Sequence, residues 1–300
     1  MKVVIQVKNE KIVEKMAEIE QIISNYLPAE EGPQKVIFEA CNYSIKVGGK
    51  RLRPMIMREV YQLFGGKEKA IEPFMAAIEM IHTSSLIHDD LPCMDNDEFR
   101  RGKPTVWKTF GYDMAVLAGD ALMIYAFETA AKAFAMETDP ARVGQAIKIL
   151  AEKTGIYGMI GGQTVDVQLT DCPMNREQLD FVYRLKTGAL LEASMMIGAV
   201  LAGACEQEVK IVEQVAAKVG MAFQIRDDIL DLTSTTEVLG KPVMSDEKNN
   251  KTTYVTLNGL EQSKKDVDCI SQQAIQQLKQ LPGQNLFLEE LIQMLITREW

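Results

Sequence analysis

Two clusters of aspartate residues offer the clearest chemistry in this sequence. One lies in the segment FQIRDDILD, residues 223–231, where Asp227 and Asp231 are four positions apart. A helix turns by about 100° per residue, so the two carboxylates would lie on one face and repel each other. A cation would relieve that repulsion. Carboxylate oxygens favour Mg²⁺, which takes one or two of them and completes its shell with water and phosphate oxygens.

The other cluster lies in HDDLPCMDND, residues 88–97, and its spacing is less regular. Asp89 and Asp95 are six positions apart, which a regular helix would direct to different sides. Pro92 lies between them and removes a helical hydrogen bond. We therefore expect a break in the helix that returns Asp95 towards Asp89.

Either cluster alone has a simpler explanation, because acidic residues at a helix end are usually a solvated cap or a turn. The presence of two clusters favours a different interpretation. Each follows an apolar helical run, and the chain between them is long enough for helices to fold back and set the clusters face to face. The pair therefore predicts a metal site.

Two basic segments complement the aspartates: GGKRLRP at residues 48–54 and RRGKPT at residues 100–105. Glycine lets the backbone approach an anion, and lysine and arginine donate charge-assisted hydrogen bonds. Exposed turns or a surface salt-bridge network would have a similar composition, but a diphosphate held between metal ions and guanidinium groups requires such side chains. His82 lies in an apolar stretch, where a histidine is more often a core residue, and its spacing alone gives it no role.

The elements that must position these residues are helices. Apolar residues recur at three- and four-residue steps, for example from Ile71 to Leu86 and from Val212 to Ile229, and glycine and proline break the chain into roughly ten helices. Residues 3–7 could form a strand, but a helical or frayed terminus is the better interpretation. We expect an all-α protein with a single domain over residues 1–300.

Composition narrows the possible functions. The formal charge is −9, and so acidic a chain is a poor candidate for nucleic-acid binding. The five cysteines are far apart and show no CxxC spacing, which favours reduced thiols over disulfides or a zinc site. The N-terminal segment lacks the features of a signal peptide, and no apolar stretch approaches the ~20 residues of a membrane span. We expect a cytoplasmic protein without a membrane span.

With these motifs the chain resembles the trans-type short-chain prenyl diphosphate synthases, which include farnesyl and geranylgeranyl diphosphate synthases. The resemblance extends from about Tyr43 to Tyr254 and follows the family's order of motifs. These motifs are GGKRLRP (48–54), HTSSLIHDDLPCMDND (82–97), RRGKPT (100–105), GGQTVD (161–166), KTG (186–188), FQIRDDILD (223–231) and LGKPVMSDEKNNKTTY (239–254). Met244 departs from the family's common glycine, which puts the closure of that loop in doubt.

The resemblance implies a bundle of helices around a deep central cavity, normally a homodimer, with about three Mg²⁺ ions per site. It assigns the ions to Asp89, Asp90, Asp95, Asp227, Asp228 and Asp231. It assigns the allylic diphosphate to Arg100, Lys186 and Lys241, with Gln163, Asp166 and Gln224 as polar supports. The isopentenyl diphosphate site is similar to Lys50, Arg53, His82 and Arg101, with Phe223 nearby. Thr187 would lie near the developing cation, and Asp246 and Lys251 match positions that help to close the site.

The chemistry implied is ionisation of an allylic diphosphate, attack by the double bond of isopentenyl diphosphate, and loss of a proton, with no protein nucleophile. Product length depends on the residues one or two turns before Asp89. Ser84 and Ser85 are small and would leave the pocket deep, because one helical turn of about 5.4 Å is close to one isoprene unit. This favours geranylgeranyl diphosphate over farnesyl diphosphate, although a side chain from another helix, such as Phe127, could supply the block instead.

Two other functions are open at this stage. A terpene cyclase also ionises a prenyl diphosphate, but the second cluster here is of the DDxxD type and Lys50 and Arg53 would be superfluous. A non-catalytic partner subunit commonly lacks aspartates from one cluster, and both clusters are intact here. Activity of the purified chain alone would separate these cases.

Overall fold

The computed structural model describes residues 2–170, 172–234 and 252–297, with side chains from Glu10 onwards. Its Cα trace divides into two compact units. Unit 1 comprises residues 1–58 and 67–147, and unit 2 comprises residues 59–66 and 148–300. Two of the three boundaries fall within helices, α3 (Leu52–Leu63) and α7 (Pro140–Thr154), and the third follows Gly66 in the segment after α3. The expected single domain and its central cavity stay predictions.

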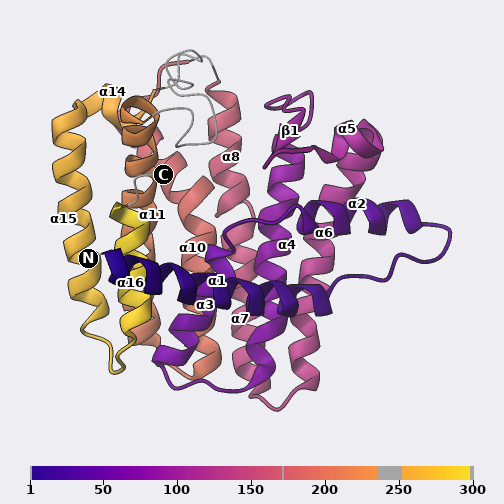
Figure 1. Ribbon diagram of the computed structural model, residues 1–300, viewed down its shortest axis with the longest axis horizontal. Helices are drawn as coiled ribbons and strands as arrows, with labels where there is room; N and C mark the ends of the chain where they lie inside the picture. Colours follow the sequence, from indigo (N-terminus) through magenta and orange to yellow (C-terminus); the bar gives the residue numbers. More distant parts are fainter. Residues whose placement is uncertain (1, 171, 235–251, 298–300) are drawn as a thin grey trace. The chain divides into compact units, whose positions relative to one another are not determined.

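Unit 1 is built from helices and one very short hairpin. Its elements, besides the first parts of α3 and α7, are α1 (Lys2–Asn25), α2 (Lys35–Lys46), η1 (Lys69–Ile71), α4 (Glu72–Asp89), β1 (Phe99–Arg100), β2 (Lys103–Pro104), α5 (Val106–Phe110), α6 (Tyr112–Ala131) and η2 (Lys132–Ala135). Figure 1 shows α4 and α6 running side by side. Helix α1 contains the short apolar run near the N-terminus, which confirms the helical interpretation of residues 3–7.

Helix α4 is the central helix of unit 1. Pro73 lies in its first turn, where the missing N–H costs nothing, and every residue from Pro73 to Ile81 is buried. A helix that is apolar on nearly all sides must be covered on all sides. It contacts α1, α2 and α6, and its C-terminal end carries the first aspartate cluster.

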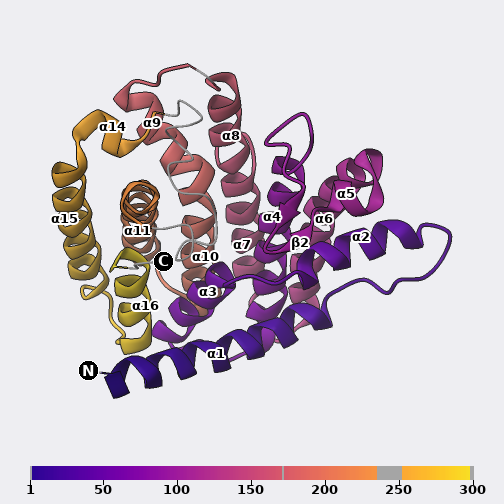
Figure 2. The same cartoon turned by 45° about the horizontal axis from the view of Figure 1, so that its top comes forward.

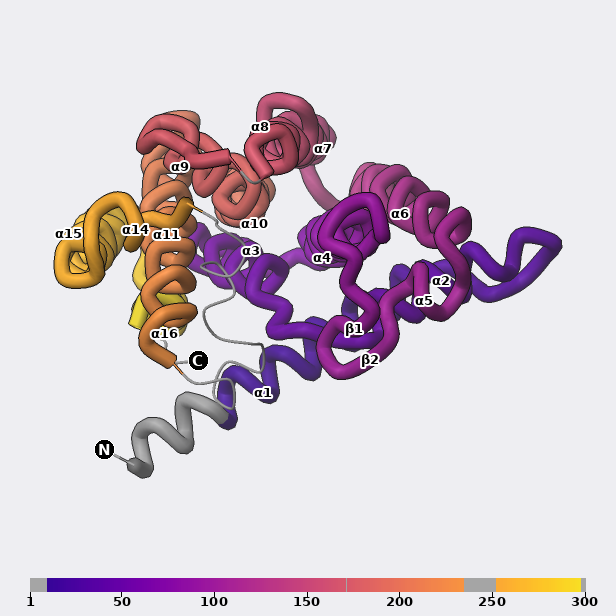
Figure 3. Tube along the Cα trace, turned by 90° about the horizontal axis from the view of Figure 1, so that it is seen from above, coloured from indigo at the N-terminus to yellow at the C-terminus, as the bar shows by residue number. Residues whose placement is uncertain are grey.

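Unit 2 is also helical. Its elements, besides the last parts of α3 and α7, are α8 (Met159–Gln168), α9 (Arg176–Val182), η3 (Tyr183–Gly188), α10 (Ala189–Ala202), α11 (Glu206–Thr233), α14 (Tyr254–Asn258), α15 (Leu260–Leu278) and α16 (Leu286–Thr297). In Figure 2, α11 is seen almost end-on with α10 on one side and α15 on the other. Figure 3 shows α14 beside α11 and α15. The second aspartate cluster lies near the end of α11.

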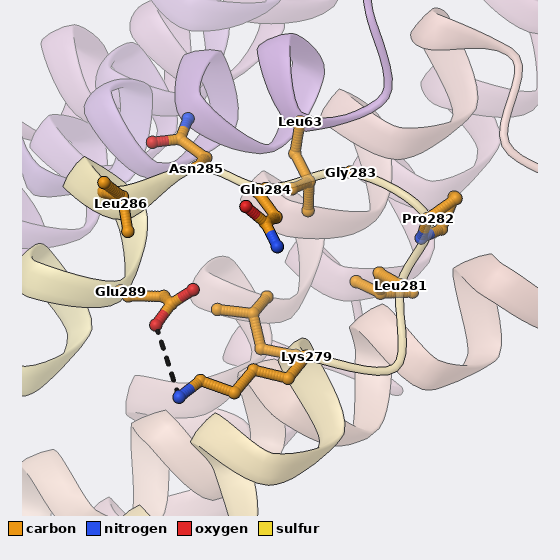
Figure 4. A pocket seen from close by; sticks show the side chains of 10 residues that line it. Leu63, Lys279, Leu281, Pro282, Gly283, Gln284, Asn285, Leu286 and Glu289 are labelled. Carbon is orange, nitrogen blue, oxygen red and sulfur yellow. Dashed lines mark ion pairs between the residues drawn. The ribbon is translucent and has the colours of Figure 1, made fainter.

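Unit 2 also contains a cavity of about 420 Å³ where the α15–α16 loop packs against α3 (Figure 4). Leu63 and Leu281 form part of its apolar wall, and Lys279 and Glu289 face each other across it at 3.7 Å. Lys218 of α11 donates a hydrogen bond to Gln277 near this end of α15. The second aspartate cluster begins nine residues further along α11, about 14 Å at 1.5 Å per residue.

The all-α class predicted from periodicity is confirmed, because the only strands in the described residues are the two-residue β1 and β2. The expectation that no stretch approaches the length of a membrane span was wrong. By length and composition, Tyr112–Ala135 and Arg176–Ala202 meet that criterion, with a hydropathy of 1.4 each. Core helices of soluble proteins also meet it, and 72% of the second window is buried against 39% of the first.

Candidate active site

The first aspartate cluster is assembled by a turn that follows α4. The helix ends at Asp89, and the amide of Asn96 bonds back to the carbonyl of Leu91 at 3.1 Å. The amide of Asp95 then donates to the carbonyl of Asp89 at 2.9 Å. The break expected at Pro92 is therefore present, and it brings the Asp95 backbone into contact with Asp89.

Asp90 lies inside this turn and is bound by Arg100. It is only 4% exposed, and its Oδ1 accepts a hydrogen bond from Nε of Arg100 at 2.6 Å and forms an ion pair with Nη2 at the same distance. Burial raises the pKa of Asp90, although the hydrogen bond from Arg100 acts in the opposite direction. Arg100 also reaches Asp97 at 3.4 Å, so it links the two ends of the cluster.

Arg101 lies at the tip of the hairpin that sequence analysis did not predict. Phe99 pairs with Pro104 and Arg100 with Lys103, which leaves Arg101 and Gly102 as a two-residue loop with φ of +53° and +73°. Two positive φ values define a type I′ turn, in which an arginine is strained. Such strain is common at functional sites.

Gly49 contacts the side chain that this turn presents. A Cβ atom at Gly49 would lie 2.6 Å from Nη1 of Arg101, and the residue has a φ of +155°. A side chain at this position would displace the Arg101 guanidinium and would strain the backbone, whereas glycine permits both. The two basic segments of the sequence are thus in direct contact within unit 1.

A cavity of about 450 Å³ in unit 1 unites the residues assigned to isopentenyl diphosphate. Its wall includes Lys50 just before α3, Arg53 in the first turn of α3, His82 from α4, and Arg101 from the hairpin. This size is typical of small-ligand sites. The four residues come from three separate motifs, and the fold brings them together.

The charge of this cavity suits an anion. Nε of Arg53 is buried and has no hydrogen-bond partner in the structure, and burial lowers the pKa of this guanidinium. Burial and the neighbouring Arg53 and Arg101 lower the pKa of His82 well below its usual value, which favours the neutral imidazole. An anion would supply the acceptor that Arg53 lacks.

The second aspartate cluster is built on an unbroken helix. Asp227 and Asp231 are one turn apart on α11 as predicted, and Asp228 between them is 4% exposed. Oδ2 of Asp228 accepts hydrogen bonds from the hydroxyl of Tyr183 at 2.6 Å and from the amide of Tyr254 at 2.8 Å. Asp228 therefore ties α11 to η3 and to α14.

The KTG motif lies in η3, a short π-helix between α9 and α10. Insertions of this kind are frequent at functional sites. Lys186 pairs with Asp166 of α8 at 2.5 Å, and the Thr187 hydroxyl donates to Oε1 of Gln224 of α11 at 2.9 Å. Gly162 permits α8 to pack on η3, because a Cβ there would lie 2.2 Å from the Lys186 nitrogen.

For the other predicted positions, the structure gives the helix or a local hydrogen bond only. Gln163 lies on α8, three positions before Asp166. Phe223 lies on α11, directly before Gln224. Ser84 is fully buried on α4 and donates its hydroxyl to the Ile81 carbonyl at 2.8 Å, and Ser85 does the same to His82. The remaining positions lie outside the described residues: Lys241, Met244, Asp246 and Lys251.

Magnesium fits the carboxylates of both units. Within the described ranges, no three His, Cys, Asp or Glu side chains form a group that could hold a metal ion by themselves. Mg²⁺ does not require one, because it is commonly held by one or two carboxylates together with substrate phosphates and water. Asp89 with Asp95, and Asp227 with Asp231, offer such oxygens.

Several residues that support the site were not predicted from the sequence. Arg51 received no role, yet it is buried and ion-paired to Glu79, which also lines the cavity around Arg53. A single carboxylate within an apolar helix requires a cation, and this could have drawn attention to Glu79. Tyr183 carried no comparable indication, because its role depends on a contact between elements distant in sequence.

Comparison with known proteins agrees with this geometry. The polyprenyl synthetase family matches residues 34–285. The chain is 43% identical over 271 residues to the heterodimeric geranylgeranyl pyrophosphate synthase large subunit 1, chloroplastic, of Arabidopsis thaliana, covering 89% of this chain and 72% of that protein. It is 42% identical over 247 residues to the farnesyl diphosphate synthase of Geobacillus stearothermophilus, covering 81% of each.

Solved structures agree as well. The geranyltransferase of Helicobacter pylori, crystallised with magnesium and isoprenyl diphosphate, matches with a TM-score of 0.82 and 32% identity and covers 96% of each chain. The resemblance in sequence and the resemblance in structure thus extend over most of the molecule. This chain belongs to the polyprenyl synthetase family and is a short-chain prenyltransferase.

Proposed function

We propose that this enzyme uses Mg²⁺ to condense isopentenyl diphosphate with allylic diphosphates, and that its final product is geranylgeranyl diphosphate. The observation that carries the proposal is the cavity of unit 1. It gathers Lys50, Arg53, His82 and Arg101 around a space of about 450 Å³, and a buried nitrogen of Arg53 there lacks an acceptor. A diphosphate matches both the charge and the size.

The carboxylates supply the other half of the reaction. Bound Mg²⁺ ions, about three per site, would neutralise the allylic diphosphate as its C–O bond breaks. Arg100, Lys186 and Lys241 would add positive charge to the same leaving group. The Thr187 hydroxyl, oriented by Gln224 at 2.9 Å, would lie near the allylic cation.

The second substrate then completes the reaction. The double bond of isopentenyl diphosphate attacks the allylic cation, which forms the new carbon–carbon bond. One proton must leave, and the released diphosphate is the acceptor, so no protein nucleophile is needed. Neutral His82 is consistent with a binding role, because it can share a hydrogen bond with a phosphate oxygen without adding charge.

The preference for a C20 product depends on two small side chains. Ser84 is fully buried, and its hydroxyl is satisfied by the carbonyl of Ile81, so it adds neither bulk nor an unpaired polar group to its surroundings. Relatives of both product classes are similar to this chain, and a farnesyl diphosphate product is the alternative.

The test is the chain length made by the purified protein from dimethylallyl and isopentenyl diphosphates with Mg²⁺. A C20 product is expected. Ser84→Tyr should shorten it and Ser84→Ala should not, because only tyrosine fills the space one turn before Asp89. A wild-type product that stops at C15 would contradict the length assignment and keep the reaction. No elongation by the chain alone would favour the partner-subunit alternative.

We also propose a cytoplasmic homodimer. Support for the dimer comes from α6, where Leu117 and Ile124 are 51% and 70% exposed on a helix of unit 1. Apolar side chains of this kind commonly mark a protein interface. Sedimentation of the wild type should give twice the chain mass, and Ile124→Glu should shift it towards the monomer. The free cysteine thiols favour the cytoplasmic location, because disulfides form mainly in oxidising compartments. Cell fractionation would test this location.

A further inference from the structure

Arg51 belongs to the GGKRLRP motif, but its side chain does not serve as a cavity donor. The guanidinium is fully buried and makes contacts to three elements. Nε donates to Oε1 of Glu20 on α1 at 2.7 Å, Nη1 to Oε1 of Glu79 on α4 at 2.7 Å, and Nη2 to the carbonyl of Ile45 on α2 at 2.6 Å. A buried arginine with these three partners holds the three helices together at one point.

The backbone at this position is also unusual. Arg51 has a φ of +47°, in the left-handed region that costs a non-glycine residue roughly 1–2 kcal/mol. Its carbonyl accepts the first hydrogen bond of α3, from the amide of Met55 at 3.1 Å. The side-chain contacts of Arg51 therefore hold a strained backbone that sets the directions of Lys50 before it and Arg53 after it.

The ion pair between Arg51 and Glu79 also affects the charge of the cavity. The Glu79 carboxylate is buried, lines the same cavity, and lies three positions before His82 on α4. Its charge already acts on Arg53 and Arg101. Without Arg51, the carboxylate would interact with these two cations alone and would compete with a diphosphate for both. The ion pair with Arg51 at 2.7 Å weakens that competition.

We propose that Glu20, Arg51 and Glu79 form a positioning triad for the isopentenyl diphosphate pocket, through which α1 takes part in substrate binding. The triad orients Lys50 and Arg53 and occupies the one carboxylate among the residues that line this cavity. It does not touch the reacting atoms. The inference rests on the proposed function, because it assigns the ligand of that cavity.

The chain offers a matched control on the same helix. Glu18 of α1 pairs with Arg58 of α3 at 2.6 Å, and Glu20 pairs with Arg51 just before α3 at 2.7 Å. Both acids are partly exposed, so neutral replacements should fold. Glu18 is absent from the cavity wall and from the triad.

The experiment compares Glu20→Gln with Glu18→Gln in steady-state kinetics, with each substrate varied in turn. Glu20→Gln should raise the KM for isopentenyl diphosphate about tenfold, the effect of one charge-assisted hydrogen bond. The KM for the allylic substrate and the kcat at saturation should stay at the wild-type values. Glu18→Gln should leave all three unchanged.

A second pair of variants tests the role of Arg51 in occupying Glu79. Arg51→Met should raise the same KM more strongly. Arg51→Met combined with Glu79→Gln should recover part of the loss, because the carboxylate that competes for Arg53 and Arg101 is then absent. A merely structural role would not give this recovery.

The outcomes separate the two proposals. An active wild type in which Glu20→Gln and Glu18→Gln behave alike, or in which both KM values and kcat change together, overturns the triad alone. A wild type that binds isopentenyl diphosphate in calorimetry yet elongates nothing overturns the proposed function. In that case the Kd for isopentenyl diphosphate, measured for the same two variants, must still show the tenfold difference.

Discussion

The two aspartate clusters contain the same kind of side chain, but they are built in opposite ways. In unit 2, Asp227 and Asp231 lie one turn apart on α11, which runs unbroken from Glu206 to Thr233. In unit 1, α4 ends at Asp89, and Asp95 returns through a turn closed by a backbone hydrogen bond of 2.9 Å. One cluster depends on helical periodicity and the other on a specific loop conformation.

The inner aspartates show a second difference. Asp90 and Asp228 are each 4% exposed. Asp90 is bound by the charged guanidinium of Arg100, whereas Asp228 accepts hydrogen bonds from a tyrosine hydroxyl and a backbone amide. The inner aspartates thus anchor their clusters through these hydrogen bonds. The outer aspartates stay the predicted ligands of a cation, although Asp231 is itself only 2% exposed.

The largest expected effect comes from removing an outer carboxylate in each cluster. Asp227→Asn and Asp89→Asn should each lower kcat on the order of 10³-fold, because each removes negative charge that a metal ion requires. Steady-state kinetics over a range of Mg²⁺ concentrations measures this. Asp268→Asn, at an exposed acid of α15, is the control and should behave as the wild type. An Asp227→Asn enzyme with normal kcat would contradict the proposal that both clusters hold Mg²⁺.

The next effect concerns the anchor of the second cluster. Tyr183→Phe removes the 2.6 Å hydrogen bond to Asp228 and leaves a buried carboxylate with one donor fewer. The free energy of unfolding should fall by about 2 kcal/mol. Urea denaturation measures it, with Tyr157→Phe as the control, since Tyr157 is 81% exposed. Equal stability of the two variants would show that Asp228 does not depend on Tyr183.

Sequence patterns predicted what depends on local geometry. The all-α class followed from apolar periodicity, and the alignment of Asp227 with Asp231 followed from helical spacing. The return of Asp95 also followed, because Pro92 gave the break a physical cause. These features require only short-range information.

The remaining features depend on contacts between distant segments. The type I′ loop at Arg101 and Gly102 contradicts turn preferences, because arginine is unfavourable there, and its contact with Gly49 is invisible in either segment alone. The inward direction of Arg51 likewise depends on Glu20 of α1, thirty-one positions away. The roles of these residues depend on tertiary contacts that outweigh the conformational preference of the local sequence. They can therefore be recognised only in the folded structure.

A smaller effect would test the turn of the first cluster. Asn96 has a φ of +55°, a conformation that asparagine tolerates better than most residues. Asn96→Ala should cost about 1 kcal/mol of unfolding free energy and raise the Mg²⁺ concentration needed for half-maximal rate, whereas Asn96→Gly should do neither. If Asn96→Gly and Asn96→Ala were equally impaired, the side chain and not the backbone conformation would be responsible.

The smallest effect is expected at Asp97, which shares Arg100 with Asp90. Arg100 lies 3.4 Å from Asp97, whose side chain is 51% exposed, but 2.6 Å from the buried Asp90. Water screens the exposed pair, so Asp97→Asn should change the free energy of unfolding by less than about 0.5 kcal/mol and kcat by less than about twofold. Asp90→Asn weakens the buried pair and should cost several times more on both scales. Denaturation and kinetics of the two variants side by side measure the contrast. Equal losses would mean that Arg100 holds the cluster through Asp97 as much as through Asp90, and the anchoring role of Asp90 would then fail.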